Sequence, residues 1–314
     1  MTKSQFTLNR RHALGLASAW LLPVTLHANA WAASAKESGG AAPASYPPLA
    51  ALEKKVGGRL GVAILNTASG ATVGHRLDER FGMCSTFKLP LAAAILRKAD
   101  QGTLRLDQWV PYTQADMVSH APVTQANLHK GGMTVGALAE AAQTTSDNPA
   151  ANLLLGLIGG PAGFTALMRE AGDTITRLDR LEPHMNAVGH ADPRDTTTPA
   201  AMAANTARML LGDWLSAGSR ATLIDWMVAT GTGAKRLRAG FPAHWRAGDK
   251  TGTGMSPGLM DKYNDIAIAW PPGKAPLIVT AYYETAKSYG GKMRDEDQAV
   301  LAEVGRIASR WSTA

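Results

Sequence analysis

Extended runs lie near both ends of this chain, and the segments between them are mostly helical. Two apolar extended runs flank a turn within residues 59–77, and two more flank a proline- and glycine-containing turn within residues 264–285. Runs of this length and composition predict two β-hairpins. We therefore expect an α+β fold, in which an antiparallel sheet is built from both ends of the chain and a helical part is inserted between them.

Helix signals fill the middle of the sequence and flank the sheet. A short helix is expected over residues 49–57, a longer one over 85–99 with Gly102 as its stop, and an amphipathic C-terminal helix from residue 295. The inserted part should contain four further helices, over residues 134–143, 149–159, 161–172 and 199–212. We expect one domain over residues 47–314, with an α/β part (47–82 and 225–314) and a helical part (83–224).

The first 32 residues read as an export signal. The paired arginines Arg10 and Arg11 precede a mostly apolar stretch that ends in small residues, which is typical of the twin-arginine route. Polar residues and a proline interrupt the stretch, so a membrane anchor is disfavoured. We expect an exported, periplasmic protein without a membrane segment in its mature form, beginning with a flexible arm over residues 33–46.

Composition excludes several other classes of function. The net charge of +7 is spread along the chain without a long basic run or interleaved aromatic residues, which argues against nucleic-acid binding. The single cysteine, Cys84, cannot form an internal disulfide, and its apolar neighbours favour a buried, inert thiol over a nucleophile. The eight histidines show no ligand spacing, so we expect no metal and no cofactor.

Three short motifs each allow a structural and a chemical interpretation. Ser85 and Lys88 share a helix face, so the serine either caps the helix or is a nucleophile beside an ammonium group. Ser146 and Asn148, in a Ser-Asp-Asn sequence before a proline, either belong to a helix cap or present polar groups from a loop. Lys250 opens a Lys-Thr-Gly sequence that is either a turn or a strand edge pairing with an extended substrate.

The three motifs together are far more specific than each alone. A Ser-x-x-Lys, a Ser-Asp-Asn and a Lys-Thr-Gly sequence in this order are typical of class A β-lactamases and penicillin-binding proteins. The stretches RLEPHMN at 180–186 and DPRDTTTP at 192–199 resemble the omega loop of the β-lactamases. About residues 50–312 thus resemble a class A serine β-lactamase. Residues 180–199 are called the omega loop below.

The resemblance implies the catalytic roles. Ser85 attacks the β-lactam carbonyl and becomes acylated, and Ser146 passes a proton to the leaving nitrogen. Glu182 and Asn186 hold the water that releases the acyl group. Either Lys88 directly or Glu182 through water deprotonates Ser85, and the sequence leaves this choice open. The implied reaction is hydrolysis of penicillins and cephalosporins, which gives antibiotic resistance, by a monomer.

Substrate-binding roles follow in the same way. Asn148 is expected to bind the side-chain amide of the substrate, and Lys250 and Thr251 to face its carboxylate. The backbone N–H groups of Ser85 and Thr253 would form the oxyanion hole.

Three more features of the resemblance concern the rim and the loop. Arg236 resembles an arginine that binds the substrate carboxylate in some members, the alternative being a solvated basic cluster, and His120 occupies a position that usually carries an aromatic residue at the entrance. Arg180 and Asp195 should pair across the omega loop, and the peptide bond before Pro183 is a candidate cis bond.

The sequence departs from the family pattern at three places. Pro149 follows the Ser-Asp-Asn sequence, where a threonine is common. Residues 254–263 form a longer strand connection than usual, and Gly254 stands where disulfide-type carbapenemases carry a cysteine, which argues against that subgroup.

Two other functions share these motifs. A penicillin-sensitive transpeptidase or carboxypeptidase, or a sensor that is acylated only once, would lack the deacylating water that Glu182 implies. Repeated turnover of a chromogenic cephalosporin separates them from a β-lactamase.

Overall fold

A five-stranded antiparallel sheet, ordered β2-β1-β9-β8-β7, is the frame of the structure, a computed structural model that describes residues 45–313. Its strands are β1 (Arg59–Asn66), β2 (Thr72–His75), β7 (Arg246–Gly254), β8 (Lys262–Trp270) and β9 (Leu277–Glu284). β1 pairs with β9 along its whole length, so that strands from the two ends of the chain meet at the centre of the sheet. This confirms the expected fold class and both hairpins.

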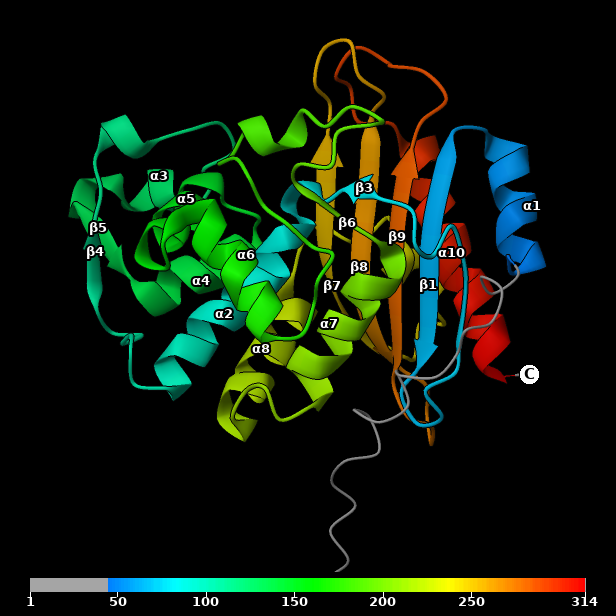
Figure 1. The fold of residues 1–314 in the computed structure, drawn as a ribbon, viewed down its shortest axis with the longest axis horizontal. Coiled ribbons are helices and arrows are strands. Elements are labelled where there is room, and N and C mark those ends of the chain that lie inside the picture. Colours follow the sequence, from blue (N-terminus) through cyan, green and yellow to red (C-terminus); the bar gives the residue numbers. More distant parts are fainter. Residues whose placement is uncertain (1–44, 314) are drawn as a thin grey trace, which may run out of the picture. The chain divides into compact units, whose positions relative to one another are not determined.

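Side-chain alternation along β1 explains why the sheet is covered on both faces. Leu60, Val62 and Ile64 belong to one buried cluster, whereas Ala63 and Leu65 belong to another, because successive side chains of a strand point to opposite faces. The first cluster is closed by the helices α1 (Pro47–Val56) and α10 (Asp295–Thr313), which lie beside β1 in Figure 1.

The other face carries the inserted helices, most of which Figure 1 shows beyond β7. They are α2 (Lys88–Asp100), α3 (Thr124–Asn127), α4 (Val135–Thr144), α5 (Asn148–Leu157), α6 (Gly160–Glu170), α7 (Pro199–Leu211) and α8 (Ala217–Ala229). The short α9 (Leu237–Gly240) instead packs against α10, and its Leu237 belongs to the first cluster. The four helices expected in the insertion agree with α4 to α7 to within two residues at each end. α7 packs against β1 and β9, and α8 packs against β7. The predicted boundary after residue 224 falls inside α8.

Short elements escape the sequence patterns. β3 (Phe81–Gly82) pairs with β6 (Thr196–Thr197), and β4 (Trp109–Pro111) pairs with β5 (Gly132–Thr134). Strands of two or three residues are too short to show a period of two, so nothing in the sequence marks them. The first of these ribbons matters for function, because it ties the chain just before Ser85 to the end of the omega loop.

The predicted export signal and nearly all of the arm over 33–46 lie outside the described residues. Within residues 45–313, no single helix is both long and apolar enough to cross a membrane. Only α5 and α6 meet that test jointly, and they are bent by 72°.

Candidate active site

Ser85 lies in a short 3₁₀ turn, Cys84–Phe87, that precedes α2 rather than inside the helix itself. Its hydroxyl caps no backbone N–H, so the capping interpretation is wrong. Instead, Ser85 Oγ accepts a hydrogen bond from Lys88 Nζ at 2.9 Å and donates to Glu182 Oε1 at 2.9 Å. The first turn of α2 thus presents the lysine to the serine, as the spacing predicted.

The Ser-Asp-Asn sequence combines the two interpretations that its residues allowed. Asp147 is the N-cap of α5 and accepts from Ala150 N at 2.9 Å, as a helix start before a proline predicts. Its neighbours face the site: Ser146 O accepts from Lys88 Nζ at 2.8 Å, and Asn148 Oδ1 accepts from the same ammonium group. Asn148 is therefore the first residue of a helix and not a loop residue.

β7 is an edge strand, and its Lys-Thr-Gly segment lies against the turn that carries Ser85. Lys250 Nζ donates to Ser146 Oγ at 3.0 Å, so Ser146 lies between two lysines. A Cβ atom on Gly252 would lie 2.8 Å from Met83 O, closer than side chains tolerate. The missing side chain of Gly252 lets the strand approach the turn and places Thr253 beside Ser85.

Glu182 joins the site from the omega loop, almost a hundred residues beyond Ser85. It is 2% exposed, and its Oε1 forms an ion pair with Lys88 Nζ at 3.0 Å. Asn186 Nδ2 donates to Glu182 Oε2 at 2.6 Å, so the two side chains are in direct contact within the loop. The bond between Glu182 and Pro183 is cis, as the resemblance implied.

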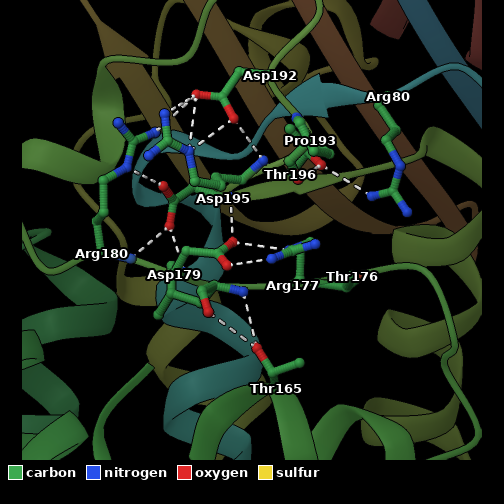
Figure 2. A network of polar contacts seen from close by, with 12 residues as sticks. Arg80, Thr165, Thr176, Arg177, Asp179, Arg180, Asp192, Pro193, Asp195 and Thr196 are labelled. Carbon is green, nitrogen blue, oxygen red and sulfur yellow. Dashed lines mark hydrogen bonds and ion pairs between the residues drawn. The ribbon is translucent and has the colours of Figure 1, made fainter. Parts of the chain in front are cut away.

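Ion pairs close the omega loop on itself (Figure 2). Arg180 Nε donates to Asp195 Oδ2 at 2.6 Å, and Asp195 Oδ1 accepts from the backbone N–H groups of Asp179 and Arg180 at 2.7 and 2.9 Å. Asp192 pairs with Arg194 at 2.9 Å on the outer side of this network. The expected pairing of Arg180 with Asp195 is confirmed, and Asp195 is its buried centre.

Burial and mutual charge set the protonation of the central groups. Burial is the largest influence on Lys88 and lowers its pKa, although the Glu182 carboxylate acts in the opposite direction. Burial and then the charge of Lys88 lower the pKa of Lys250 well below its ordinary value. For Glu182, burial opposes ionisation, but the Lys88 ammonium and the hydrogen bonds from Lys88, Ser85 and Asn186 outweigh it and lower its pKa. The site therefore contains an ionised carboxylate beside two destabilised ammonium groups.

Left-handed backbone is concentrated around the site. Among the described non-glycine residues with positive φ are Cys84 (46°), His120 (63°), Ser146 (63°) and Asp195 (58°). Each costs roughly 1–2 kcal/mol relative to ordinary backbone. Such strain persists where packing holds it, and it is typical of functional sites.

The two rim residues behave differently. Arg236 is 2% exposed, so the alternative of a solvated cluster is wrong; its guanidinium donates to Gly252 O at 2.8 Å and to Thr253 Oγ1 at 2.6 Å. His120 is exposed and lies beside the start of α5, because its backbone O accepts from Asn148 N at 3.0 Å. Its ring contacts Thr145 O at 2.9 Å. Thr251 Oγ1 lies 2.6 Å from Thr232 Oγ1, which fixes its hydroxyl beside Lys250.

Sequence reasoning missed three residues that support the site. Asn152 bonds both backbone polar groups of Glu182, Asn264 Nδ2 donates to Gly82 O and Met83 O, and Thr232 contacts Thr251. Asn152 lies four residues after Asn148 on α5, so a helical face count could have found it. No local signal marks the other two.

Cys84 is fully buried and free, and burial raises its pKa to about 12, in agreement with the expected inert thiol. Across residues 45–313, no three His, Cys, Asp or Glu side chains are grouped so that they could hold a metal ion.

A serine held between a lysine and a glutamate, on an antiparallel sheet with a helical insertion, defines a serine hydrolase site of the acyl-transfer type. The model of the β-lactamase enzyme family matches residues 46–311. This chain belongs to that family, and its relatives of known structure place it in class A. It is a hydrolase that acts on the β-lactam ring.

Individual relatives cover almost the whole chain. β-Lactamase L2 of Stenotrophomonas maltophilia is 48% identical over 296 residues, 94% of each chain. An ancestral (GNCA) class A β-lactamase of known structure is 55% identical, with a TM-score of 0.80 over 84% of this chain and 98% of its own. A β-lactamase from Burkholderia vietnamiensis is 47% identical, with a TM-score of 0.80 over 88% and 99%.

Proposed function

We propose that this β-lactamase opens penicillins and cephalosporins through an acyl-enzyme on Ser85. The observation that carries the proposal is the position of one hydroxyl between two opposite charges. Ser85 Oγ accepts from an ammonium and donates to a carboxylate, which is the arrangement that activates a nucleophile.

Acylation then uses the contacts already present. The Ser85 proton passes to Glu182 Oε1, the acceptor to which it is hydrogen-bonded, while Lys88 stabilises the developing negative charge on Oγ. This geometry favours Glu182 as the base and needs no bridging water for that step. The backbone N–H groups of Ser85 and Thr253 bind the oxyanion, a contribution of about 3–4 kcal/mol for each donor. Ser146 delivers a proton to the ring nitrogen as the C–N bond breaks, and Lys250 holds its hydroxyl by a hydrogen bond. The proton that Glu182 took from Ser85 returns to Ser146 through Lys88, which contacts both residues, so Glu182 is a carboxylate again before deacylation.

Deacylation becomes possible because the acylated Ser85 no longer carries its hydroxyl proton. Once Ser85 Oγ is esterified it can no longer donate, so Glu182 Oε1 becomes free to accept from a water molecule. Asn186 Nδ2 keeps the other carboxylate oxygen in place at 2.6 Å. Glu182 takes a proton from this water, the hydroxyl attacks the ester, and Ser85 leaves with a proton.

Residues of β7 and the first residue of α5 recognise different groups of the substrate. Lys250 and Thr251 bind the substrate carboxylate, and Asn148 binds the side-chain amide. Because Arg236 is buried and donates to Thr253 Oγ1, we assign it an indirect role: it leaves the Thr253 hydroxyl hydrogen free to donate to the carboxylate. His120 borders the entrance.

The test is the fate of the acyl group in Glu182→Gln, which keeps shape but removes the base. We expect wild-type protein to hydrolyse many equivalents of a chromogenic cephalosporin. The variant should retain a penicillin adduct visible by intact-mass spectrometry, because Lys88, with its lowered pKa and its contact with Ser85 Oγ, can still take the serine proton at a reduced rate, whereas no other group replaces Glu182 at the water. Ser85→Ala should form no adduct. An adduct that persists on wild-type protein would instead favour the transpeptidase or sensor, and an adduct on Ser85→Ala would remove Ser85 from its role.

We also propose export by the twin-arginine route to the periplasm, a role as a monomer, and resistance of the producing cell to β-lactams. The support for export is the sequence around Arg10 and Arg11. Replacing both with lysine should retain the enzyme in the cytoplasm and lower the resistance of the cell. Light scattering on the purified enzyme tests the monomer.

A further inference from the structure

A pocket separate from the catalytic residues lies against the omega loop, at Val188, Gly189 and His190. Its volume is about 540 Å³, within the range of roughly 300–1,000 Å³ that is usual for small-molecule sites. The middle of the omega loop, the connection before β8 and the end of β9 line it, and none of the residues assigned above to catalysis or substrate binding does. The lining includes Arg59, Val188, Leu259, Met260, Lys262 and Glu284.

The lining contains three charged side chains, and two of them, Arg59 and Glu284, form an ion pair. Arg59 Nη1 donates to Glu284 Oε2 at 2.6 Å, and Arg59 Nη2 donates to Arg80 O at 2.7 Å. Lys262 lies opposite Glu284 in the β8–β9 register, but the carboxylate is turned to the arginine. Arg59 Nη2 also lies 3.4 Å from Glu79, outside the lining, but Glu79 pairs more closely with Arg76, at 2.8 Å. The lining itself therefore has one positive charge, that of Lys262, without a carboxylate beside it.

Lys262 carries that charge in an unusual setting. It is 3% exposed, and within the described part of the chain its Nζ donates only to Met260 O, at 3.3 Å. Among residues 45–313 no carboxylate oxygen lies within 4.0 Å of this nitrogen. An ammonium has three donors, and buried donors without partners cost free energy.

The position of the lysine is fixed by close packing of its stem. A Cβ atom on Gly82 would lie 3.3 Å from Lys262 Cε, and one on Gly254 would lie 3.5 Å from Lys262 Cδ. Two glycines thus provide the channel through which the stem passes, with the charged end at the pocket. The longer connection at 254–263 that the sequence shows brings Leu259 and Met260 to the rim of this pocket.

We propose that this pocket binds a small organic carboxylate, whose carboxylate oxygens accept from Lys262 and whose apolar body rests on Val188, Leu259 and Met260. The anion completes the missing acceptors of the lysine and balances its charge. The apolar lining favours a ring or branched chain over a bare inorganic ion.

Phenylacetate is the probe, and calorimetric titration of the full-length mature enzyme is the assay. Acetate, which lacks the apolar body, and 2-phenylethanol, which lacks the charge, are the matched ligands. Lys262→Met keeps the length of the side chain and removes the charge. Lys274→Met, in the exposed turn after β8, makes the same change outside the pocket, and Lys250→Met reports binding at the catalytic site instead.

We expect wild-type protein and Lys274→Met to bind phenylacetate equally, and both matched ligands to bind more weakly. Lys262→Met should lose affinity by about tenfold or more, the value of a charge-assisted hydrogen bond. Equal binding by Lys262→Met, equal binding of 2-phenylethanol, or no binding to wild-type protein would overturn the proposal. So would an affinity that Lys250→Met abolishes and Lys262→Met keeps. If Lys262→Met fails to fold, the comparison of ligands on wild-type protein still decides.

Discussion

Replacing Asn152 with alanine should impair release of the acyl group although Asn152 touches no substrate. Asn152 Nδ2 donates to Glu182 O at 2.9 Å, and Glu182 N donates to Asn152 Oδ1 at 3.0 Å. One side chain on α5 thus satisfies both backbone polar groups of the residue that activates water. Among residues 45–313, these are the only hydrogen bonds from a side chain to the Glu182 backbone.

The size of the effect can be worked from these two hydrogen bonds. Each contributes about 0.5–1.5 kcal/mol net, so their loss destabilises the closed position of Glu182 by about 1–3 kcal/mol. If deacylation requires the closed position, a change of about 2 kcal/mol corresponds to roughly a 30-fold slower rate. The variant also weakens the contact between Ser85 Oγ and Glu182 Oε1, which slows acylation. We expect deacylation to slow more than acylation, so that the acyl-enzyme accumulates.

Intact-mass spectrometry during turnover of a penicillin measures this directly, alongside kcat with a chromogenic cephalosporin. Asn127→Ala is the matched control, because it removes a side-chain hydrogen bond to Val123 O within the helical part but outside the omega loop. It should lower stability slightly without an adduct. Wild-type kcat and no adduct in Asn152→Ala would refute the claim that this amide positions Glu182.

Three more predictions concern stability and the thiol. Hydrogen bonds from Arg194 hold the pKa of Asp192 at about 2, below its ordinary 3.8, so the stability it contributes is present above about pH 4 and lost as the pH falls toward 2. Acid titration of unfolding should therefore show a smaller loss over this range in Asp192→Asn than in wild-type protein. Cys84, with its pKa near 12, should resist iodoacetamide in the folded enzyme and react in denaturant, as mass spectrometry would show. A Cβ atom on Gly254 would lie 2.8 Å from Cys84 Sγ, close to the separation of about 3 Å across a disulfide, so Gly254→Cys should form that bond on air oxidation and lose it with reductant.

The sequence predicts the long periodic elements of this fold and misses those defined only by their partners. The hairpin over residues 59–77 and the helix from 199 carry strong local signals, because their patterns extend over several turns or strand repeats. β3 and β6 have two residues each, and their pairing depends on contacts between segments more than a hundred residues apart. Such pairing leaves no period to read.

The site shows the same division. Ser85, Lys88 and Lys250 stand inside motifs whose internal spacing places them on one face or strand, so they could be named in advance. The direct hydrogen bond between Ser85 and Glu182 could not, because it depends on how the omega loop closes over α5. The tightness of that closure is a property of packing and of ion pairs such as Arg180 with Asp195.

The charges in the catalytic pocket explain why an anionic substrate completes it. Lys88 and Lys250 both donate to Ser146, while Glu182 is the only carboxylate among residues 45–313 that pairs with either of them. Burial makes the second positive charge costly, and it lowers the pKa of Lys250 for that reason. In the mechanism proposed above, a β-lactam brings a carboxylate to Lys250, which offsets the cost and favours the protonated form of the lysine. Substrate binding thereby stabilises the ammonium that hydrogen-bonds Ser146, the group that must deliver a proton to the leaving nitrogen, so recognition of the anion and protonation of the leaving group are coupled through one lysine.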